Sequence, residues 1–524
     1  MLTRDGTPGI LMTKLTYGRL GRADLSVGLL AGVPAIARAV AVPLGIVVLA
    51  LLLRTWRLEL QGWTPDTYEQ LAAARRLASA DFPLSRIYPP GVAATMAPFF
   101  LFLPATLASM QAVIVGASLA LIGVAYALVL KATGDRLAAV LLAGALAIMP
   151  QFVYFSRDGL FDVVGTAWII SAIALVPVLR GRGLAWFAAY GVMLGIAVNV
   201  RATDAAMLPA LLIYGCGSEG APFTPRALLG RVLRRDLVLV GVVMVAVSAV
   251  FAYIGGWTGN AAGAPITFSV AGAHVAFYLF AEFGFASSVV ILPLAALGAR
   301  EVWIRNRPLL LAAAYMLAVW PVAHAPLPFA NGRYMLPGLV LALLLAAHAP
   351  ASVARMTSGW RAGRGAIATR AAFGAVAILG LIWLSTDAVM LYRWPVTASR
   401  SNEAAYRQLR PVVAGLPDGS VLVSAGTRGV SGSNERIQYL DLIDYSLRDG
   451  NTPERVQGIV DEVNQARARG VPVYYLYTYF EATKDDMGSG GPGFDQYYDA
   501  VAARFRLTET FRADLPNFIL YRID

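Results

Sequence analysis

Eight residues that could act on a substrate lie in short polar segments between strongly apolar stretches of the chain. They are Asp66, Glu69, Tyr88, Arg157, Asp158, Asp162, Arg201 and Arg333. A carboxylate directly after a membrane-spanning helix is poorly suited to packing against lipid and well suited to chemistry at the membrane surface. Arginine guanidinium groups bind phosphate oxygens in a bidentate way. The set therefore predicts a pocket that contains a base, Asp66, and binds an anionic headgroup.

Structural roles are the alternative for the same residues. Asp66-Thr-Tyr-Glu69 has the spacing of a capping box that begins a helix over residues 67–80, and a cap would also hold the carboxylate in place. Arg157 with Asp158 or Asp162, and Arg201 with Asp204, could be ordinary salt bridges at helix ends. We favour the pocket because all of these residues are expected on one side of the membrane.

No metal-ligand cluster is evident, since the chain has one cysteine, Cys216, and its three histidines, His274, His324 and His348, fall in separate helices. A divalent cation bound by Asp66 and Asp162 stays open, because hard cations need only carboxylates, phosphate and water. No other cofactor is indicated. His324 is expected to be a satisfied packing histidine.

The composition is that of a membrane protein. Of 524 residues, 57% are hydrophobic and 14% charged, and the mean hydropathy is +0.61. A soluble chain of this length and composition is excluded, and repeated apolar stretches predict a polytopic α-helical protein. The net charge of +11 follows the membrane topology and does not indicate a nucleic-acid partner. Glu282, inside one of these stretches, is expected to pair with an arginine across the bundle.

Eleven membrane-spanning helices are predicted. They lie near residues 39–56, 107–130, 137–156, 163–179, 184–200, 205–216, 236–256, 271–298, 309–325, 334–350 and 371–391. The basic N-terminal segment precedes an apolar stretch with no small-residue cleavage site after it, which predicts an uncleaved first helix and a cytoplasmic N-terminus.

The distribution of basic residues sets the orientation. The loops expected inside are 131–136, 180–183, 217–235, 299–307 and 351–370, and they hold 15 Lys or Arg, against three in the short outer loops. If residues 92–105 crossed the membrane, these basic loops would face outward. We therefore predict that residues 92–105 do not cross the membrane. We expect an interfacial or re-entrant segment there, broken by Pro98 and Pro104, within a first outer loop over residues 57–106.

The last part of the chain reads as a small α/β domain. Segments 420–424, 471–477 and 518–522 predict strands, and 452–469 predicts a helix. The domains are thus 1–392, in the membrane, and 393–524, outside the cytoplasm.

Two features of the predicted α/β domain could bind ligands. The glycine-containing segment 426–432 resembles a nucleotide-binding loop, although the spacing of its glycines is wrong for the dinucleotide-binding fingerprint. Tyr474, Tyr475, Tyr477 and Tyr479 could stack on sugars. Both faces of 473–477 are apolar, so we favour a buried parallel strand.

Three motifs between residues 88 and 212 give the chain a family resemblance. They are Tyr88-Pro-Pro, Ser156-Arg157 followed by Asp162, and Gly195-Ile-Ala-Val-Asn-Val-Arg201-Ala-Thr with Leu208-Pro-Ala-Leu-Leu. With Arg333-Tyr-Met-Leu-Pro337 they resemble the GT-C superfamily of membrane glycosyltransferases over roughly residues 40 to 350. The similarity is to the branch of lipid A aminoarabinose transferases, protein O-mannosyltransferases and rhizobial lipopolysaccharide sugar transferases.

The resemblance implies roles for the residues. It implies a sugar transferase with a polyprenyl-phosphate donor, in which Asp66 deprotonates the acceptor. Arg201 stands where the family usually has a lysine that contacts the donor phosphate, Arg333 could do likewise, and Asp162 matches the acidic residue of the second outer loop. Thr67 stands where a second acidic residue is common, so Glu69 or Asp158 would have to replace it.

The expected function is an inverting glycosyltransferase of the bacterial plasma membrane, acting on a glycan, lipid or protein acceptor at the outer face. A transporter or flippase of a lipid-linked sugar is one alternative. It would show internal repeats and polar residues at the midplane of the membrane, which the sequence lacks. A non-catalytic scaffold that binds envelope glycan is the other.

Overall fold

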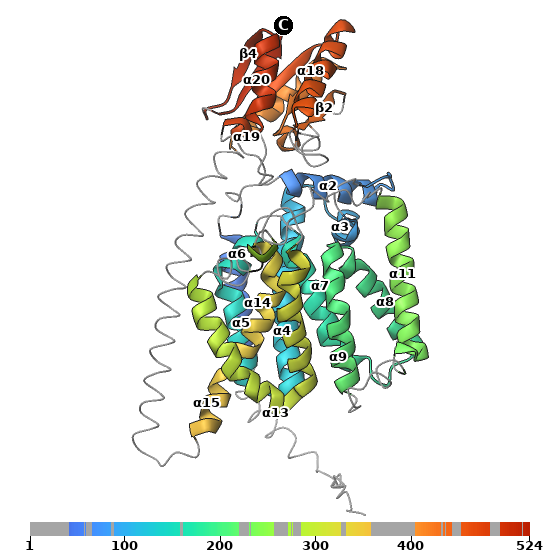
Figure 1. Ribbon diagram of the computed structural model, residues 1–524, viewed down its shortest axis with the longest axis vertical. Coiled ribbons are helices and arrows are strands. Elements are labelled where there is room, and N and C mark those ends of the chain that lie inside the picture. Colours follow the sequence, from blue (N-terminus) through green and yellow to red (C-terminus); the bar gives the residue numbers. More distant parts are fainter. Residues whose placement is uncertain are drawn as a thin grey trace, which may run out of the picture. The chain divides into compact units, whose positions relative to one another are not determined.

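The computed structural model describes most of the chain (Figure 1). The described residues are 41–56, 58, 65–84, 89–157, 161–218, 230, 232–255, 271–273, 275, 285–325, 332–357, 404–430, 433–434, 436–442, 452–482, 493–515 and 517–524. The chain divides into two compact units, Met1–Ile46 and Val47–Asp524. The predicted domain boundary at residue 392, the last predicted span, His274 and Glu282 lie outside the described residues.

The polar segment after the first helix contains two short helices, α2 (Pro65–Ala78) and α3 (Gly91–Phe100). They pack on each other and, with α4 (Leu107–Thr133), enclose a cluster of buried apolar side chains. Proline suits the first position of a helix, because its missing N–H has no partner there anyway. The helix predicted to begin at residue 67 therefore begins at Pro65, which places Asp66 in its first turn and not at the capping position.

The break expected at Pro98 falls two residues later. Pro98 lies inside α3, and the helix ends at Phe100. A proline this close to the C-terminal end of a short helix removes a single hydrogen bond, which the helix tolerates before it ends.

The predicted span 137–156 consists of two helices, α5 (Arg136–Ile148) and α6 (Pro150–Phe155). Pro150 has no N–H for the carbonyl of Leu146, so the α-helix cannot continue through it. Arg54, in the helix Ala41–Thr55, donates to the carbonyls of Leu146 (2.8 Å) and Ala147 (2.9 Å) and to Ser118 Oγ (2.7 Å). The fully buried Arg54 thus caps the end of α5.

A row of helices follows (Figure 1). These are α7 (Asp162–Leu175) with the 3-10 turn η2 (Val176–Val178), α8 (Leu184–Val198), η3 (Ala202–Met207), α9 (Leu208–Ser218) and α11 (Arg235–Gly255). α7 lies between α4 and α8, and α8 packs along α11. A Cβ added to Gly191 would lie 2.8 Å from Val240 O, and one added to Gly195 would lie 2.6 Å from Val247 Cβ. These two small residues on one face allow the close packing of α8 on α11.

The longest helix among the described residues, α13 (Phe285–His324), joins two predicted spans. It is broken at Asn306 (φ −153°, ψ 76°), whose Oδ1 accepts from the backbone N–H of Leu309 at 3.1 Å. The loop predicted over 299–307 is therefore almost entirely helical, with Asn306 as the cap of the second half. η5 (Gly332–Met335), α14 (Leu336–Ala346) and α15 (Ala349–Thr357) follow, and α13 packs on α14 and α9.

Three helices within the described ranges are long and apolar enough to cross a membrane, namely Leu107–Thr133, Arg235–Gly255 and Arg333–Met356. Shorter apolar helices accompany them, including Ala41–Thr55, Asp162–Val178 and Leu184–Val198. The predicted helical class is confirmed. The count of eleven spans stays a prediction.

The C-terminal part contains a five-stranded mixed sheet in the order β2-β1-β3-β5-β4. Its elements are β1 (Val421–Ser424), β2 (Gln438–Asp441), α18 (Pro453–Ala468), β3 (Val473–Tyr477), α20 (Asp495–Arg504), β4 (Leu507–Arg512) and β5 (Ile519–Ile523). β1 pairs in parallel with β2 and β3, and β5 runs antiparallel to β3 and β4. The three predicted strands and the helix between them are confirmed; β2 and β4 were not predicted.

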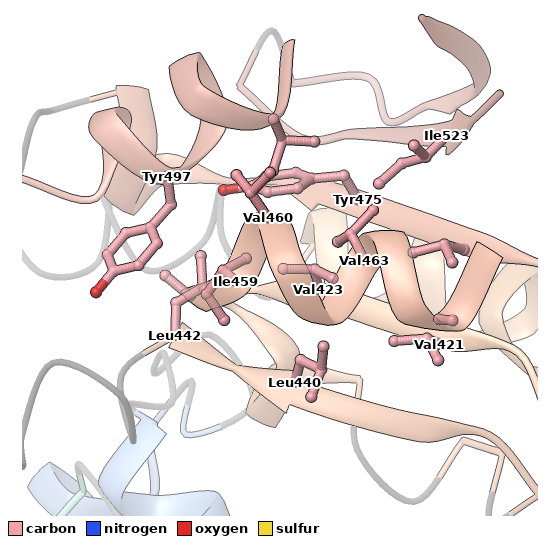
Figure 2. Close-up of a cluster of buried hydrophobic side chains, with 14 of the residues drawn as sticks. Val421, Val423, Leu440, Leu442, Ile459, Val460, Val463, Tyr475, Tyr497 and Ile523 are labelled. Carbon is pink, nitrogen blue, oxygen red and sulfur yellow. The ribbon is translucent and has the colours of Figure 1, made fainter. Parts of the chain in front are cut away.

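The core of this sheet explains two ambiguous motifs. Figure 2 shows Val423 of β1 and Tyr475 of β3 beside Ile459, Val460 and Val463 of α18. Tyr475 is fully buried, so core packing accounts for it, as expected. The strand was predicted to be parallel, and β3 is parallel only to β1, because it runs antiparallel to β5.

The glycines of the suspected nucleotide loop also have a packing role. A Cβ added to Gly426 would lie 2.8 Å from the hydroxyl of Tyr406, and one added to Gly429 would lie 2.4 Å from the same ring. Packing against Tyr406 therefore accounts for both glycines.

Candidate functional site

A buried ion-pair cluster joins three helical elements. Nη1 of Arg201 lies 2.9 Å from Oδ1 of Asp162, the first residue of α7, and Nε lies 3.2 Å from Oδ1 of Asp204, in η3. Asp162 and Asp204 are fully buried, and Arg201 is 7% exposed. One guanidinium thus bridges two carboxylates in a low-dielectric environment, which fixes its orientation.

Arg333 joins the same carboxylate from η5. Its Nε lies 3.7 Å from Oδ2 of Asp162. The ring of Tyr334 lies 5.7 Å from Cζ of Arg201 and 5.4 Å from Cζ of Arg333, at cation–π distance from both. We call Asp162, Arg201, Asp204, Arg333 and Tyr334 the arginine cluster. Three of the predicted site residues, Asp162, Arg201 and Arg333, are brought together here.

Two glycines allow the cluster to form. The N–H of Gly91 donates to the carbonyl of Asn199 (2.8 Å), and a Cβ on Gly91 would lie 2.4 Å from backbone atoms of Asn199 and Val200. The Pro89-Pro90-Gly91 motif thus packs directly on the segment that leads into Arg201. Gly165 lies one turn after Asp162, where a Cβ would approach Oδ2 of Asp204 to 3.3 Å.

His324 supports the cluster from α13. Its Nδ1 lies 2.9 Å from the carbonyl of Trp320, and its Nε2 lies 2.9 Å from Oγ1 of Thr203. The His324 ring stacks on Tyr334 at 5.5 Å, and Nε1 of Trp320 donates to the carbonyl of Tyr334 at 2.7 Å. His324 is a satisfied packing histidine, as predicted.

Below about pH 7, the net charge of the cluster favours an anion. Burial raises the pKa of Asp204 to about 7; the charge of Asp162 raises this pKa as well, and Arg201 lowers it. Below that pH, Asp204 holds a proton, so two guanidinium groups face one carboxylate. Among the described residues, Nη2 of Arg201 and Oδ2 of Asp204 are buried and have no hydrogen-bond partner. Arg201 therefore retains a donor for a ligand oxygen.

Arg157 has a different setting. It is 3% exposed, and its Nη1 donates to the carbonyl of Leu53 at 3.4 Å. Its own carbonyl accepts from Nε2 of Gln111 of α4 at 2.8 Å. These contacts attach the turn after α6 to the first helix and to α4.

The remaining predicted residues are placed only in part. Asp66 lies in the first turn of α2, but its side chain, Tyr88 and Asp158 fall outside the described residues. Glu69 lies half-buried on α2. No group of three or more His, Cys, Asp or Glu that could hold a metal occurs within the described ranges. The cation considered between Asp66 and Asp162 stays a prediction.

Sequence reasoning gave Asp204, Tyr334 and Thr203 no functional role. Asp204 was recognised only as the i+3 partner of Arg201, and Tyr334 only as part of the motif around Arg333. Their adjacency to the predicted arginines was the available signal. Nothing in the sequence indicated that Thr203 would contact His324.

One part of the chain matches a known protein family. Residues 88–225, which include Asp162, Arg201 and Asp204, match the family dolichyl-phosphate-mannose-protein mannosyltransferase. No curated protein matches the chain.

Solved structures share the fold. ArnT from Cupriavidus metallidurans in the apo state is similar with a TM-score of 0.59 and 14% identity, over 94% of this chain and 98% of that one. ArnT bound to undecaprenyl phosphate is similar with a TM-score of 0.56 and 14% identity, over 93% of this chain and 98% of that one. The Archaeoglobus fulgidus oligosaccharyltransferase in the apo form is similar with a TM-score of 0.52 and 12% identity, over 88% of this chain and 71% of that one. The family match and the shared fold agree with the resemblance to the GT-C superfamily.

Proposed function

We propose that this chain, which has the fold of the GT-C glycosyltransferases, is an inverting glycosyltransferase with a polyprenyl-phosphate sugar as donor. The acceptor is a glycan, lipid or protein of the cell envelope, at the outer face of the bacterial inner membrane. In this orientation the N-terminus is cytoplasmic and the C-terminal domain lies outside. The observation that supports the proposal best is the buried pair of arginines on Asp162.

The arginine cluster binds the phosphate of the donor. Nη2 of Arg201 has no hydrogen-bond partner within the described residues, and Arg333 presents a second guanidinium. As the bond from the anomeric carbon to the phosphate oxygen breaks, negative charge builds on the phosphate, and guanidinium groups stabilise it. Asp162 orients both arginines, since each is anchored to one of its oxygens.

Asp66 acts as the base. In a single displacement, an acceptor hydroxyl attacks the anomeric carbon, its proton passes to Asp66, and polyprenyl phosphate leaves from the opposite face with inversion. α2 holds Asp66 in its first turn and packs on α3, whose Gly91 contacts the segment before Arg201. This chain of contacts connects the base with the phosphate site. Glu69 and Asp158 are the candidates for a second acid, and Tyr88 and Arg157 complete the proposed site.

The relatives support the donor class. One similar structure, ArnT, was solved with undecaprenyl phosphate, and an archaeal oligosaccharyltransferase with a dolichol-phosphate and an inhibitory peptide. A flippase would use the same phosphate site without transferring sugar. A scaffold would use neither the phosphate site nor the base.

Two variants separate binding from chemistry. Asp66→Asn should bind polyprenyl phosphate like the unaltered protein and release none from a polyprenyl-phosphate sugar, with the exposed Asp81→Asn as matched control. Arg333→Gln, which leaves Asp162 paired with Arg201, should weaken binding by roughly tenfold or more, the value of one hydrogen bond to a charged group. Full turnover by Asp66→Asn would remove Asp66 as the base, and unchanged binding by Arg333→Gln would remove the phosphate site.

A further inference from the structure

A cavity lies among α8, α9 and α11, with a volume of about 770 Å³. Its walls are apolar stripes at helical spacing. They include Phe187, Tyr190 and Leu194 of α8, Leu211 of α9, and Val240 and Met244 of α11. The hydroxyl of Tyr190 donates to the carbonyl of Ala172 at 2.9 Å, so its polar atom is satisfied and does not need the cavity. The walls suit hydrocarbon.

Helix packing explains why the space is open. α11 packs on α8 through Gly191 and Gly195, whereas α9 packs on α13. Two neighbouring helices are thus held by different partners, and a gap is left between them. Gly241 of α11 lines this gap, and a Cβ added there would meet no atom within 4 Å.

The rim of the cavity is basic. Arg180, Arg182 and Arg234 line it and are exposed, and among the described residues only Arg234 is paired with an acid there, Asp236, at 2.7 Å. Cζ of Arg182 lies 5.4 Å from the ring of Trp186, which is 55% exposed. Exposed tryptophan beside arginine is typical of the level of lipid headgroups.

This rim lies far from the arginine cluster. α7 runs from Asp162, in the cluster, to Leu175, and η2 leads on to Arg180. At 1.5 Å per residue, a helix of this length separates the two by about 20 Å. α9 likewise begins beside the cluster and ends at the cavity, where Cys216 forms part of its wall. The two basic sites therefore occupy opposite ends of the same helices.

We propose that the cavity binds an anionic glycerophospholipid from the leaflet opposite the catalytic site. The acyl chains fill the apolar space, and the phosphate contacts Arg180 and Arg182. A polyprenyl donor with its phosphate on Arg201 would place only hydrocarbon at this rim. The positive charges of the rim arginines would then have no anionic partner from the donor. Basic residues near a membrane surface attract anionic lipids with about 1 kcal/mol each.

Native mass spectrometry of the purified full-length protein measures lipid binding. Phosphatidylglycerol should bind at least about tenfold more tightly than phosphatidylcholine. The double variant Arg180→Gln/Arg182→Gln should lose this preference. The double variant Arg136→Gln/Arg300→Gln, which removes the same charge from exposed positions elsewhere, should keep it. Equal binding of the two lipids, or equal loss in both variants, would overturn the proposal.

A second measurement locates the lipid. Phosphatidylglycerol with a photoreactive acyl chain should crosslink to residues 208–216 or 237–244. Gly241→Phe should abolish the crosslink by filling the cavity, and Gly123→Phe, at an exposed glycine with equal space, should not. Bound lipid should also slow alkylation of Cys216, the one cysteine of the sequence. Displacement of the crosslink by polyprenyl phosphate would assign the cavity to the donor tail and contradict the proposal.

Discussion

The central residue of the proposed site is Arg201, which extends from the end of α8 between two buried carboxylates. A buried arginine with a single acid would leave several donors without partners, at a large cost in free energy. Asp162 and Asp204 satisfy Nη1 and Nε and leave Nη2 for a ligand. The arrangement is preorganised, because the guanidinium need not move when a phosphate binds.

Asp204 makes the stability of the fold depend on pH. Its pKa is raised from 3.8 to about 7, so the folded protein holds the proton more tightly than the unfolded chain. The resulting stabilisation is fully present when the pH is below the pKa of Asp204 in the unfolded chain. It is lost as the pH rises through the pKa in the folded protein, at about 1.4 kcal/mol per pH unit. Thermal unfolding of the wild type should therefore shift to lower temperature between about pH 5 and about pH 8. Asp204→Asn should show a flatter profile, and parallel profiles would contradict the assigned pKa.

For individual residues, the sequence predicted which charged side chains form the site better than it predicted the residues that each of them contacts. Asp162, Arg201 and Arg333 were expected in one pocket because each follows an apolar stretch on the same side. The pairing of Arg201 with two acids depends on the extended backbone of Arg201 (φ −144°, ψ 136°) and on the space beside Gly165. Both are properties of the folded chain and leave no periodic pattern in the sequence.

Among the elements, α8 has two tasks. Its C-terminal end leads into Arg201, and its face with Gly191 and Gly195 packs on α11. Gly195 belongs to one of the motifs on which the family resemblance rests, and the structure gives it a packing role. The position of Arg201 therefore depends on contacts made between helices.

Gly195→Leu should destabilise the protein. A side chain there would clash with Val247 and push α11 away from α8, and such overpacking costs about 1–3 kcal/mol. For a chain of 524 residues, this lowers the thermal unfolding temperature by about 1–3 °C, whereas Gly123→Leu, at an exposed position of α4, should change it little. An equal effect of both variants would show that the α8–α11 contact contributes nothing specific.

Helices were predicted well where apolar stretches were long, and less well at their ends. Pro150 divides one predicted span, and a single capping residue, Asn306, replaces a predicted loop. β4 was missed because four of its six side chains are exposed, so the strand lacks a strong apolar pattern. Such boundaries depend on local backbone hydrogen bonds, which hydropathy does not report.

For the whole molecule, the same helices hold two basic sites at opposite ends. The arginine cluster at one end is buried and is the proposed site for the phosphate of a lipid-linked donor. The rim at the other end is exposed and opens into an apolar cavity. Composition predicted a membrane protein with arginines on both sides, but the cavity follows from helix packing and could not be read from the sequence.

Sugar transfer itself tests the account most directly. Purified full-length protein is incubated with a panel of polyprenyl-phosphate sugars and envelope acceptors, and the products are analysed by mass spectrometry and by the anomeric configuration of the new bond. We predict one sugar added to the acceptor, with inversion, for each polyprenyl phosphate released. Movement of an intact donor across vesicles with no transfer, or no reaction with any donor, would contradict the proposed enzyme.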